Sequence, residues 1–160
     1  MSAAVTEQSQ QVVVFDLSGE TYALEIAFVN EIIRIQPITP VPGSVDYIEG
    51  LINLRGRVTP VVDMRKRFDL PARATGERSR IIVMQISEDI VGMIVDAVSE
   101  VITVSPDVIE PAARVVTALD AEYIRGIAKV DGQLVAILNP DKILEYADIV
   151  DQQLLLGPVE

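Results

Sequence analysis

The sequence contains no cysteine and no histidine. Without cysteine, the chain has no disulfide, no thiolate zinc site and no cysteine nucleophile. Without histidine, it lacks the commonest general base near neutral pH and the commonest metal ligand. No phosphate-binding glycine loop or serine nucleophile motif is present either. We therefore expect a protein that is not an enzyme and needs no metal or cofactor.

Long apolar runs are also missing, although 49% of the 160 residues are hydrophobic. Residues 81–86 and 90–98 form the longest runs, and polar or charged residues interrupt them well short of the ~20 residues of a spanning helix. Residues 1–11 lack the basic flank and apolar core of a signal peptide, so we expect a polar, flexible tail. These features predict a cytoplasmic protein without direct membrane insertion.

The formal net charge of −11 disfavours nucleic acid as a partner, because affinity for phosphates comes from Lys and Arg. Most of the 13 basic residues gather in residues 55–80. They are Arg55, Arg57, Arg65, Lys66, Arg67, Arg73, Arg78 and Arg80. Such an uneven distribution of charge along the chain can mark an interaction face. For residues 65–80, ordinary solvated side chains on turns and a linker are the simpler interpretation.

One stretch of the chain occurs twice. Residues 47–68 read YIEGLINLRGRVTPVVDMRKRF, and residues 123–144 read YIRGIAKVDGQLVAILNPDKIL. In each copy an apolar strand follows Tyr-Ile-x-Gly, a turn at Gly56 or Gly132 reverses the chain, and a second apolar strand follows. The sequence therefore predicts one small β unit used twice.

A helix start is predicted after the second strand of each copy. Asp63 is a candidate N-cap for a short helical turn through Phe68. Asn139 is followed by Pro140, and proline is favoured at the first helical position. The residues beyond it that share one apolar helix face predict a C-terminal amphipathic helix. They are Ile143, Leu144, Ala147 and Val150.

Turn residues bound further short strands in the rest of the chain. These strands are predicted over residues 12–17, 21–26, 31–35, 80–86 and 90–95. The segment DAVSEVITV repeats AFVNEIIRI, which aligns Glu100 with Glu31. Pro60 lies inside a predicted strand and should confine it to a sheet edge or a bulge.

About five short strands in each copy, without long helices, predict a mainly β fold of two small five-stranded barrels. Runs that are apolar at every position, such as IIVM at residues 81–84, would be buried on both faces. We therefore expect a hydrophobic core shared by the barrels as well as one inside each. The expected division is a tail at residues 1–11, one domain at residues 12–150 and a C-terminal helix and tail at residues 140–160. Within the domain we expect a first barrel at about 18–79 and a second at about 80–139, with the N-terminal strand as a candidate for sharing between the two barrels.

The stretch GLINLRGRVTPVVDMRKRF closely resembles the signature of the CheW-like family of bacterial chemotaxis coupling proteins. The segments VVVFDLSGETYALEIAFVNEII, VGMIVDAVSEV and EYIRGIAKVDGQLVAILN also fit, so the resemblance extends from about Val12 to Tyr146. It implies two SH3-like barrels around a common core. It also implies an adaptor that joins the cytoplasmic tips of chemoreceptors, the methyl-accepting chemotaxis proteins, to the regulatory domain of the histidine kinase CheA. Other CheW copies in array rings are further implied partners.

The resemblance also implies binding residues. Val29 and Glu31 match positions in the receptor-binding groove of the family, Ile33 would supply groove wall, and Arg55 matches the arginine of the NLRG turn near that glutamate. The kinase-facing surfaces are expected on the ends of both barrels, at Gly56, Arg57, Val58, Gly126, Asp131 and Gly132. Core packing is the competing interpretation for Val29. A structural role competes for Glu31, because Glu100 occupies the equivalent place.

Two other functions stay open at this stage. One is a CheW-like adaptor of a pilus-type array, which the sequence does not separate from one of flagellar chemotaxis. The other is a generic anion-binding or membrane-surface module that uses the basic window of residues 55–80. Such a module would bind in a strongly salt-dependent manner, because exposed charges are screened.

Overall fold

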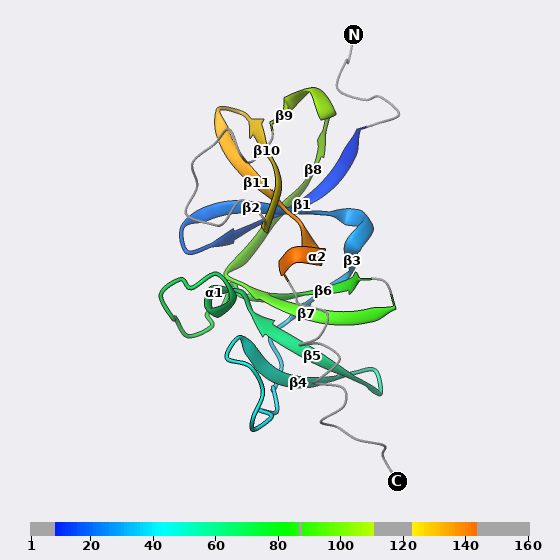
Figure 1. Ribbon diagram of the computed structural model, residues 1–160, viewed down its shortest axis with the longest axis vertical. Helices are drawn as coiled ribbons and strands as arrows, with labels where there is room; N and C mark the ends of the chain where they lie inside the picture. The colour runs from blue at the N-terminus through cyan, green and yellow to red at the C-terminus, as the bar shows by residue number, and fades with distance from the viewer. Residues whose placement is uncertain (1–8, 87, 111–122, 144–160) are drawn as a thin grey trace.

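The computed structural model describes residues 9–86, 88–110 and 123–143, and they form two β-sheets with short helical turns (Figure 1). The six-stranded sheet has the order β8-β1-β2-β11-β10-β9. Its strands are β1 (Gln10–Leu17), β2 (Glu20–Glu25), β8 (Ala97–Val104), β9 (Ile109–Glu110), β10 (Ile124–Val130) and β11 (Gln133–Leu138). The five-stranded sheet has the order β3-β6-β7-β5-β4. Its strands are β3 (Val29–Arg34), β4 (Ile48–Leu54), β5 (Arg57–Asp63), β6 (Arg80–Ile86) and β7 (Asp89–Val95).

The mainly β fold with two sheets is confirmed, but the strands are divided between the sheets differently from the expectation of residues 18–79 and 80–139. The hairpin β1-β2 joins the strands that follow residue 96, and the hairpin β6-β7 joins β3, β4 and β5. Each copy of the sequence repeat thus completes its sheet with the hairpin that precedes the other copy. Val61 of β5 pairs in parallel with Gly92 of β7, and Ala136 of β11 pairs in parallel with Tyr22 of β2. A sequence repeat shows which strands are alike, and strand pairing decides which strands are neighbours.

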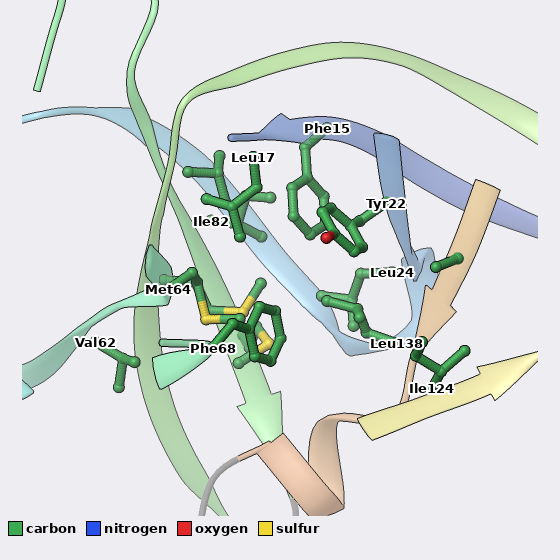
Figure 2. Packing of buried hydrophobic residues seen from close by; sticks show 14 of the residues in the cluster. Phe15, Leu17, Tyr22, Leu24, Val62, Met64, Phe68, Ile82, Ile124 and Leu138 are labelled. Atoms are coloured by element: carbon green, nitrogen blue, oxygen red, sulfur yellow. The ribbon is translucent and has the colours of Figure 1, made fainter. Parts of the chain in front are cut away.

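A hydrophobic core shared by the two sheets is also confirmed. Along β6, Ile82 and Met84 face this shared core while Ile81 and Val83 face a smaller cluster of the five-stranded sheet, as the two-residue period of a strand requires. The shared core contains buried residues from both sheets and from the segment after β5 (Figure 2). They are Phe15, Leu17, Tyr22, Leu24, Ile48, Val62, Met64, Phe68, Ile82, Met84, Val91, Met93, Val95, Ile124, Ile127, Ala136 and Leu138. Burying one such large side chain contributes on the order of 2 kcal/mol, so this core is the main connection between the sheets.

The helix starts lie where the sequence predicts them. The helix α1 (Met64–Arg67) follows Asp63, whose carboxylate accepts hydrogen bonds from the backbone N–H groups of Arg65 and Lys66. The helix α2 (Pro140–Ile143) begins at the predicted proline. The remainder of the expected C-terminal helix and most of the expected N-terminal tail lie outside the described residues. None of the helices in the described part of the chain is long and apolar enough to span a bilayer.

The prediction that Pro60 marks an edge strand or a bulge is wrong. Strand β5 lies inside the sheet, between β7 and β4. Opposite Pro60, the N–H and C=O groups of Leu51 both bond to Thr39 on the outer side of β4, at 2.8 and 2.9 Å. Leu51 and Pro60 therefore form a pair without mutual hydrogen bonds. The missing N–H of proline removes no bond between β4 and β5, and the pairing of β5 with β7 begins only at Val61, so this position in an interior strand tolerates proline.

Candidate interaction surface

The loop between β4 and β5 is a two-residue turn made of Arg55 and Gly56. Both residues have positive φ, at 53° and 84°, which is the geometry of a type I′ hairpin turn. Asn53 closes the turn, because its Oδ1 accepts the backbone N–H of Gly56 at 2.7 Å. The equivalent turn between β10 and β11, Asp131 and Gly132, has nearly the same angles, 50° and 78°. The two copies therefore present opposite charges from the same kind of turn.

The predicted pair of Arg55 and Glu31 is present. Both terminal guanidinium nitrogens of Arg55 donate to the carboxylate of Glu31, with Nη1 lying 3.0 Å from Oε1. Glu31 is on β3 and Arg55 follows β4, the two outer strands of the five-stranded sheet, so the pair closes the gap between opposite sheet edges. Gln36 supports this closure by donating to the Asn53 carbonyl at 3.3 Å. Because the Arg55 side chain is 69% exposed, the pair contributes only ~0 to 1 kcal/mol to stability, and its main effect is to orient two side chains at the surface.

The apolar side chains of β3 are less accessible than the sequence suggested. Val29 is half-buried against the shared core and Ile33 is half-buried against the cluster of the five-stranded sheet. Ile32 is the exposed one, at 39%, and sequence reasoning missed it. A β-bulge at Asn30 shifts the register of β3 against β6. Val101, which holds the equivalent place on β8, is likewise exposed, at 48%.

Five of the six residues expected to face the kinase are at the surface, at the hairpin turns of both sheets. Gly56, Arg57 and Val58 are exposed at the β4-β5 turn, and Val58 is 52% exposed. In the six-stranded sheet, Asp131 and Gly132 are exposed at the corresponding turn. Sequence reasoning missed Leu134, which is 56% exposed and holds the same place in its copy as Val58. The copies therefore share an exposed apolar residue just after the turn.

Gly126 is not part of that surface, and this expectation needs correction. A Cβ atom on Gly126 would lie 2.5 Å from Cγ2 of Ile109, because β9 pairs alongside β10 next to this position. Gly50 has the same role in the first copy, where a Cβ atom would lie 2.2 Å from the carbonyl oxygen of Thr39. Both glycines lie where the pairing register of their hairpin shifts. The glycine of Tyr-Ile-x-Gly is thus a packing requirement in both copies.

Arg65 in the basic window is buried, which contradicts the interpretation of this residue as a solvated side chain. Its Nε and Nη2 donate to the two carboxylate oxygens of Asp96 at 3.0 and 2.6 Å, and its Nη1 donates to the Pro71 carbonyl at 2.8 Å. Asp96 also accepts the backbone N–H of Ser18 at 2.8 Å. Burial alone would raise the pKa of Asp96, but the hydrogen bonds from Arg65 and Ser18 outweigh it, so this pKa is lowered. The pair ties α1, the β1-β2 turn and the β7-β8 junction together.

Arg67 is also a structural residue. Its guanidinium lies between the rings of Tyr47 and Tyr123, 4.8 and 4.9 Å from their centroids, and donates to the Tyr123 hydroxyl at 3.1 Å. The two tyrosines are equivalent residues of the repeat, and they immediately precede strands of different sheets, β4 and β10. Lys66 pairs with Glu49 at 2.9 Å. Three of the eight basic residues in the window are therefore committed to the fold, and the arginines that remain lie at the β4-β5 turn, in the loop before β6 and at the first position of β6.

A rigid double sheet that exposes paired and apolar side chains on its turns and edge strands has the organisation of an interaction scaffold. Comparison with known proteins agrees with this class. The chain belongs to the CheW family, whose CheW-like domain model matches residues 11–148. The family resemblance inferred from the NLRG stretch is thereby confirmed.

Relatives match the chain over most of its length. Chemotaxis protein CheW of Bacillus subtilis is 37% identical over 142 residues, which cover 89% of this chain and 91% of the relative. Chemotaxis protein CheW of Rhizobium meliloti is 32% identical over 139 residues, covering 87% and 90%. The crystal structure of the scaffolding protein TtCheW from Thermoanaerobacter tengcongensis superposes with a TM-score of 0.81 at 38% identity, covering 89% of this chain and 92% of that one. The family consists of non-catalytic scaffold proteins, and this chain is such a scaffold rather than an enzyme.

Proposed function

We propose that the protein is the adaptor that couples the cytoplasmic tips of chemoreceptors to the histidine kinase CheA in chemotaxis signalling arrays. It acts in the cytoplasm, at the arrays that membrane receptors form. The observation that carries the proposal is the Arg55–Glu31 pair, displayed at the NLRG turn of a chain that matches the CheW-like domain over nearly its full length. The pilus-type array and the generic anion-binding module have no comparable support.

The receptor surface that we propose consists of the outer side of β3 and the β4-β5 turn. A receptor tip is a helical hairpin, and helices dock by laying apolar ridges into a groove with a polar rim. The apolar surface along β3 comes from Ile32, which is exposed, and from Val29 and Ile33, which are half-buried. The pair of Glu31 and Arg55 supplies the polar rim and fixes the register of the helix.

The kinase surfaces that we propose are the two equivalent hairpins, which lie at opposite ends of the molecule (Figure 1). The first presents Gly56, Arg57 and Val58. The second presents Asp131 and Gly132, to which we add Leu134 on the basis of its exposure. Two separate apolar contacts at opposite ends allow one protein to touch two neighbours, the regulatory domain of CheA and a further adaptor copy in an array ring.

Co-precipitation of the full chain with a receptor cytoplasmic fragment and with CheA tests this function. We expect the protein to bind each of them and to bring both into one complex. A protein that is folded by circular dichroism and binds neither partner would overturn the proposal.

Charge reversal at the β4-β5 turn tests the receptor surface. Arg55→Glu places two carboxylates side by side, and we expect receptor affinity to fall about tenfold or more while the melting temperature stays close to the wild type. The double variant Glu31→Arg/Arg55→Glu restores an ion pair and should recover part of the lost affinity. Lys129→Glu makes the same change of charge on exposed β10 and serves as the control. Unfolding of Arg55→Glu, or an equal loss in the control, would remove Arg55 from the receptor site.

A further inference from the structure

A cavity of about 540 Å³ lies where the end of β3, the loop before β6 and the start of β8 meet. Arg34, Arg78 and Arg80 line it, together with Glu77 as the only acidic residue among its described lining. Ile35 and Val98 add apolar walls. Arg34 is on β3, two residues after Ile32, so the cavity adjoins the proposed receptor surface, but no residue named in the receptor or kinase surfaces lines it.

The arginines of this cavity are not neutralised by the part of the chain that the structure describes. No carboxylate in that part lies within ion-pairing distance of Arg34, Arg78 or Arg80. Arg80 is held at the cavity wall, where its Nη1 donates to the carbonyl oxygens of Glu77 and Ser79 at 3.0 and 2.8 Å. The chain carries a net charge of −11, so an unpaired basic cluster stands out against an acidic protein.

Two of these arginines also face each other across a strand pair. Arg34 on β3 is directly opposite Arg80 on β6 in the antiparallel register. Like charges directly opposite each other destabilise a sheet, and a bound anion would relieve that repulsion. The cavity and the cross-strand charges are separate observations, and both indicate an anionic ligand.

The shape of the site favours a polypeptide over a single small ion. A second cavity of about 380 Å³ shares residues 76–79 and Ala97 with the first, so the two together extend along the loop before β6. The second cavity adds acidic side chains, Asp16 and Asp96, beside Arg73. A continuous polyanion such as a nucleic acid would be repelled by these residues and by the acidic remainder of the protein. A short segment that places separate carboxylates at the arginines avoids both the repulsion from Asp16 and Asp96 and the repulsion from the acidic remainder of the protein.

We propose that the cavity lined by Arg34, Arg78 and Arg80 is a docking site for a polypeptide segment that carries spaced acidic side chains. Arg34 and Arg78 form charge-assisted hydrogen bonds to its carboxylates, for which the planar guanidinium is suited. Ile35 and Val98 contact the aliphatic parts of the segment.

Fluorescence anisotropy with a labelled peptide of alternating Glu and Ala tests the site, and the matched peptide of Gln and Ala reports any contribution that is independent of charge. We expect the Gln peptide to bind about tenfold more weakly, because it lacks charge-assisted hydrogen bonds. Arg34→Gln/Arg78→Gln should lose a similar factor for the Glu peptide. Lys129→Gln/Lys142→Gln removes the same charge from exposed positions outside the cavity and should bind the Glu peptide within about twofold of the wild type.

Several results would overturn the proposal. They are equal binding of the two peptides, unchanged binding by the arginine variant, or an equal loss in the lysine variant. Tighter arginine-dependent binding of a single-stranded oligonucleotide would overturn the choice of a polypeptide. The free arginine variant should melt no lower than the wild type, because a pair of facing like charges has been removed. A markedly lower melting temperature would show that these arginines serve the fold.

Discussion

Gly50 has no room for a side chain, and this limit is set by one backbone atom. A Cβ atom there would lie 2.2 Å from the Thr39 carbonyl oxygen, and the φ of 152° is one that L side chains rarely adopt. Thr39 cannot move away without breaking its two hydrogen bonds to Leu51. We expect Gly50→Ala to lower the free energy of unfolding by about 3 kcal/mol or more, measured by urea denaturation.

The loop before β6 provides the control for this substitution. Gly76 has no neighbour within 4 Å of its Cβ position and no positive φ. Gly76→Ala should therefore change stability by less than about 1 kcal/mol, and an increase would reflect the reduced entropy of the unfolded chain. If both variants were equally stable, steric crowding at Gly50 would not explain its place in the repeat.

At the scale of elements, Asp96 connects the β7-β8 junction to α1 and to the β1-β2 turn. Its pKa lies below the ordinary value because Arg65 and the Ser18 N–H outweigh the effect of burial. A lowered folded-state pKa stabilises the fold at pH values above the unfolded pKa of about 4, and this contribution is lost as the pH falls through the folded value. We expect Asp96→Asn to cost about 2 to 3 kcal/mol at pH 7, since it leaves Arg65 buried without its charge partner.

The pH dependence separates this pair from a general loss of packing. The difference in unfolding free energy between the wild type and Asp96→Asn should shrink as the pH is lowered below about 4. Glu88→Gln, on the exposed β6-β7 turn, should follow the wild-type curve within about 0.5 kcal/mol. A pH-independent difference for Asp96→Asn would show that shape, and not charge, holds this junction.

Local chemistry allowed the sequence to predict single elements and one functional contact. Glycine turns, the Asp63 cap and the burial of β6 on both faces depend on neighbouring residues, and the alignment of Arg55 with the family predicted its pair with Glu31. Strand partners could not be predicted in this way, because the hairpins of the two copies are similar enough to fit either sheet. The burial of Arg65 escaped prediction for the same reason, since its partner Asp96 is distant in sequence and becomes a neighbour only once the sheets are assembled.

At the scale of the whole molecule, the five-stranded sheet is an insertion into the six-stranded one. All its strands lie between Val29 and Val95, whereas the other sheet is built from the segments before and after. Continuity in sequence would allow the inserted unit to be an independent domain. The contacts between the two sheets argue against an independent domain. The rings of Tyr22 and Phe68 meet across the boundary, with centroids 6.2 Å apart, and the Arg67 guanidinium contacts the rings of Tyr47 and Tyr123 on its two sides.

A fragment of residues 29–95 decides between these possibilities. Separation would expose the shared-core side of this unit, including Val62, Met64, Ile82, Met84 and Met93. At on the order of 2 kcal/mol each, their loss approaches 10 kcal/mol, which is comparable to the whole stability of a small domain. We expect the fragment to show no cooperative urea transition, and the full chain to unfold in one transition that coincides by circular dichroism and tyrosine fluorescence. A cooperative fragment, or two resolved transitions in the full chain, would show that the sheets fold independently and that receptor contacts on one sheet are not rigidly coupled to kinase contacts on the other.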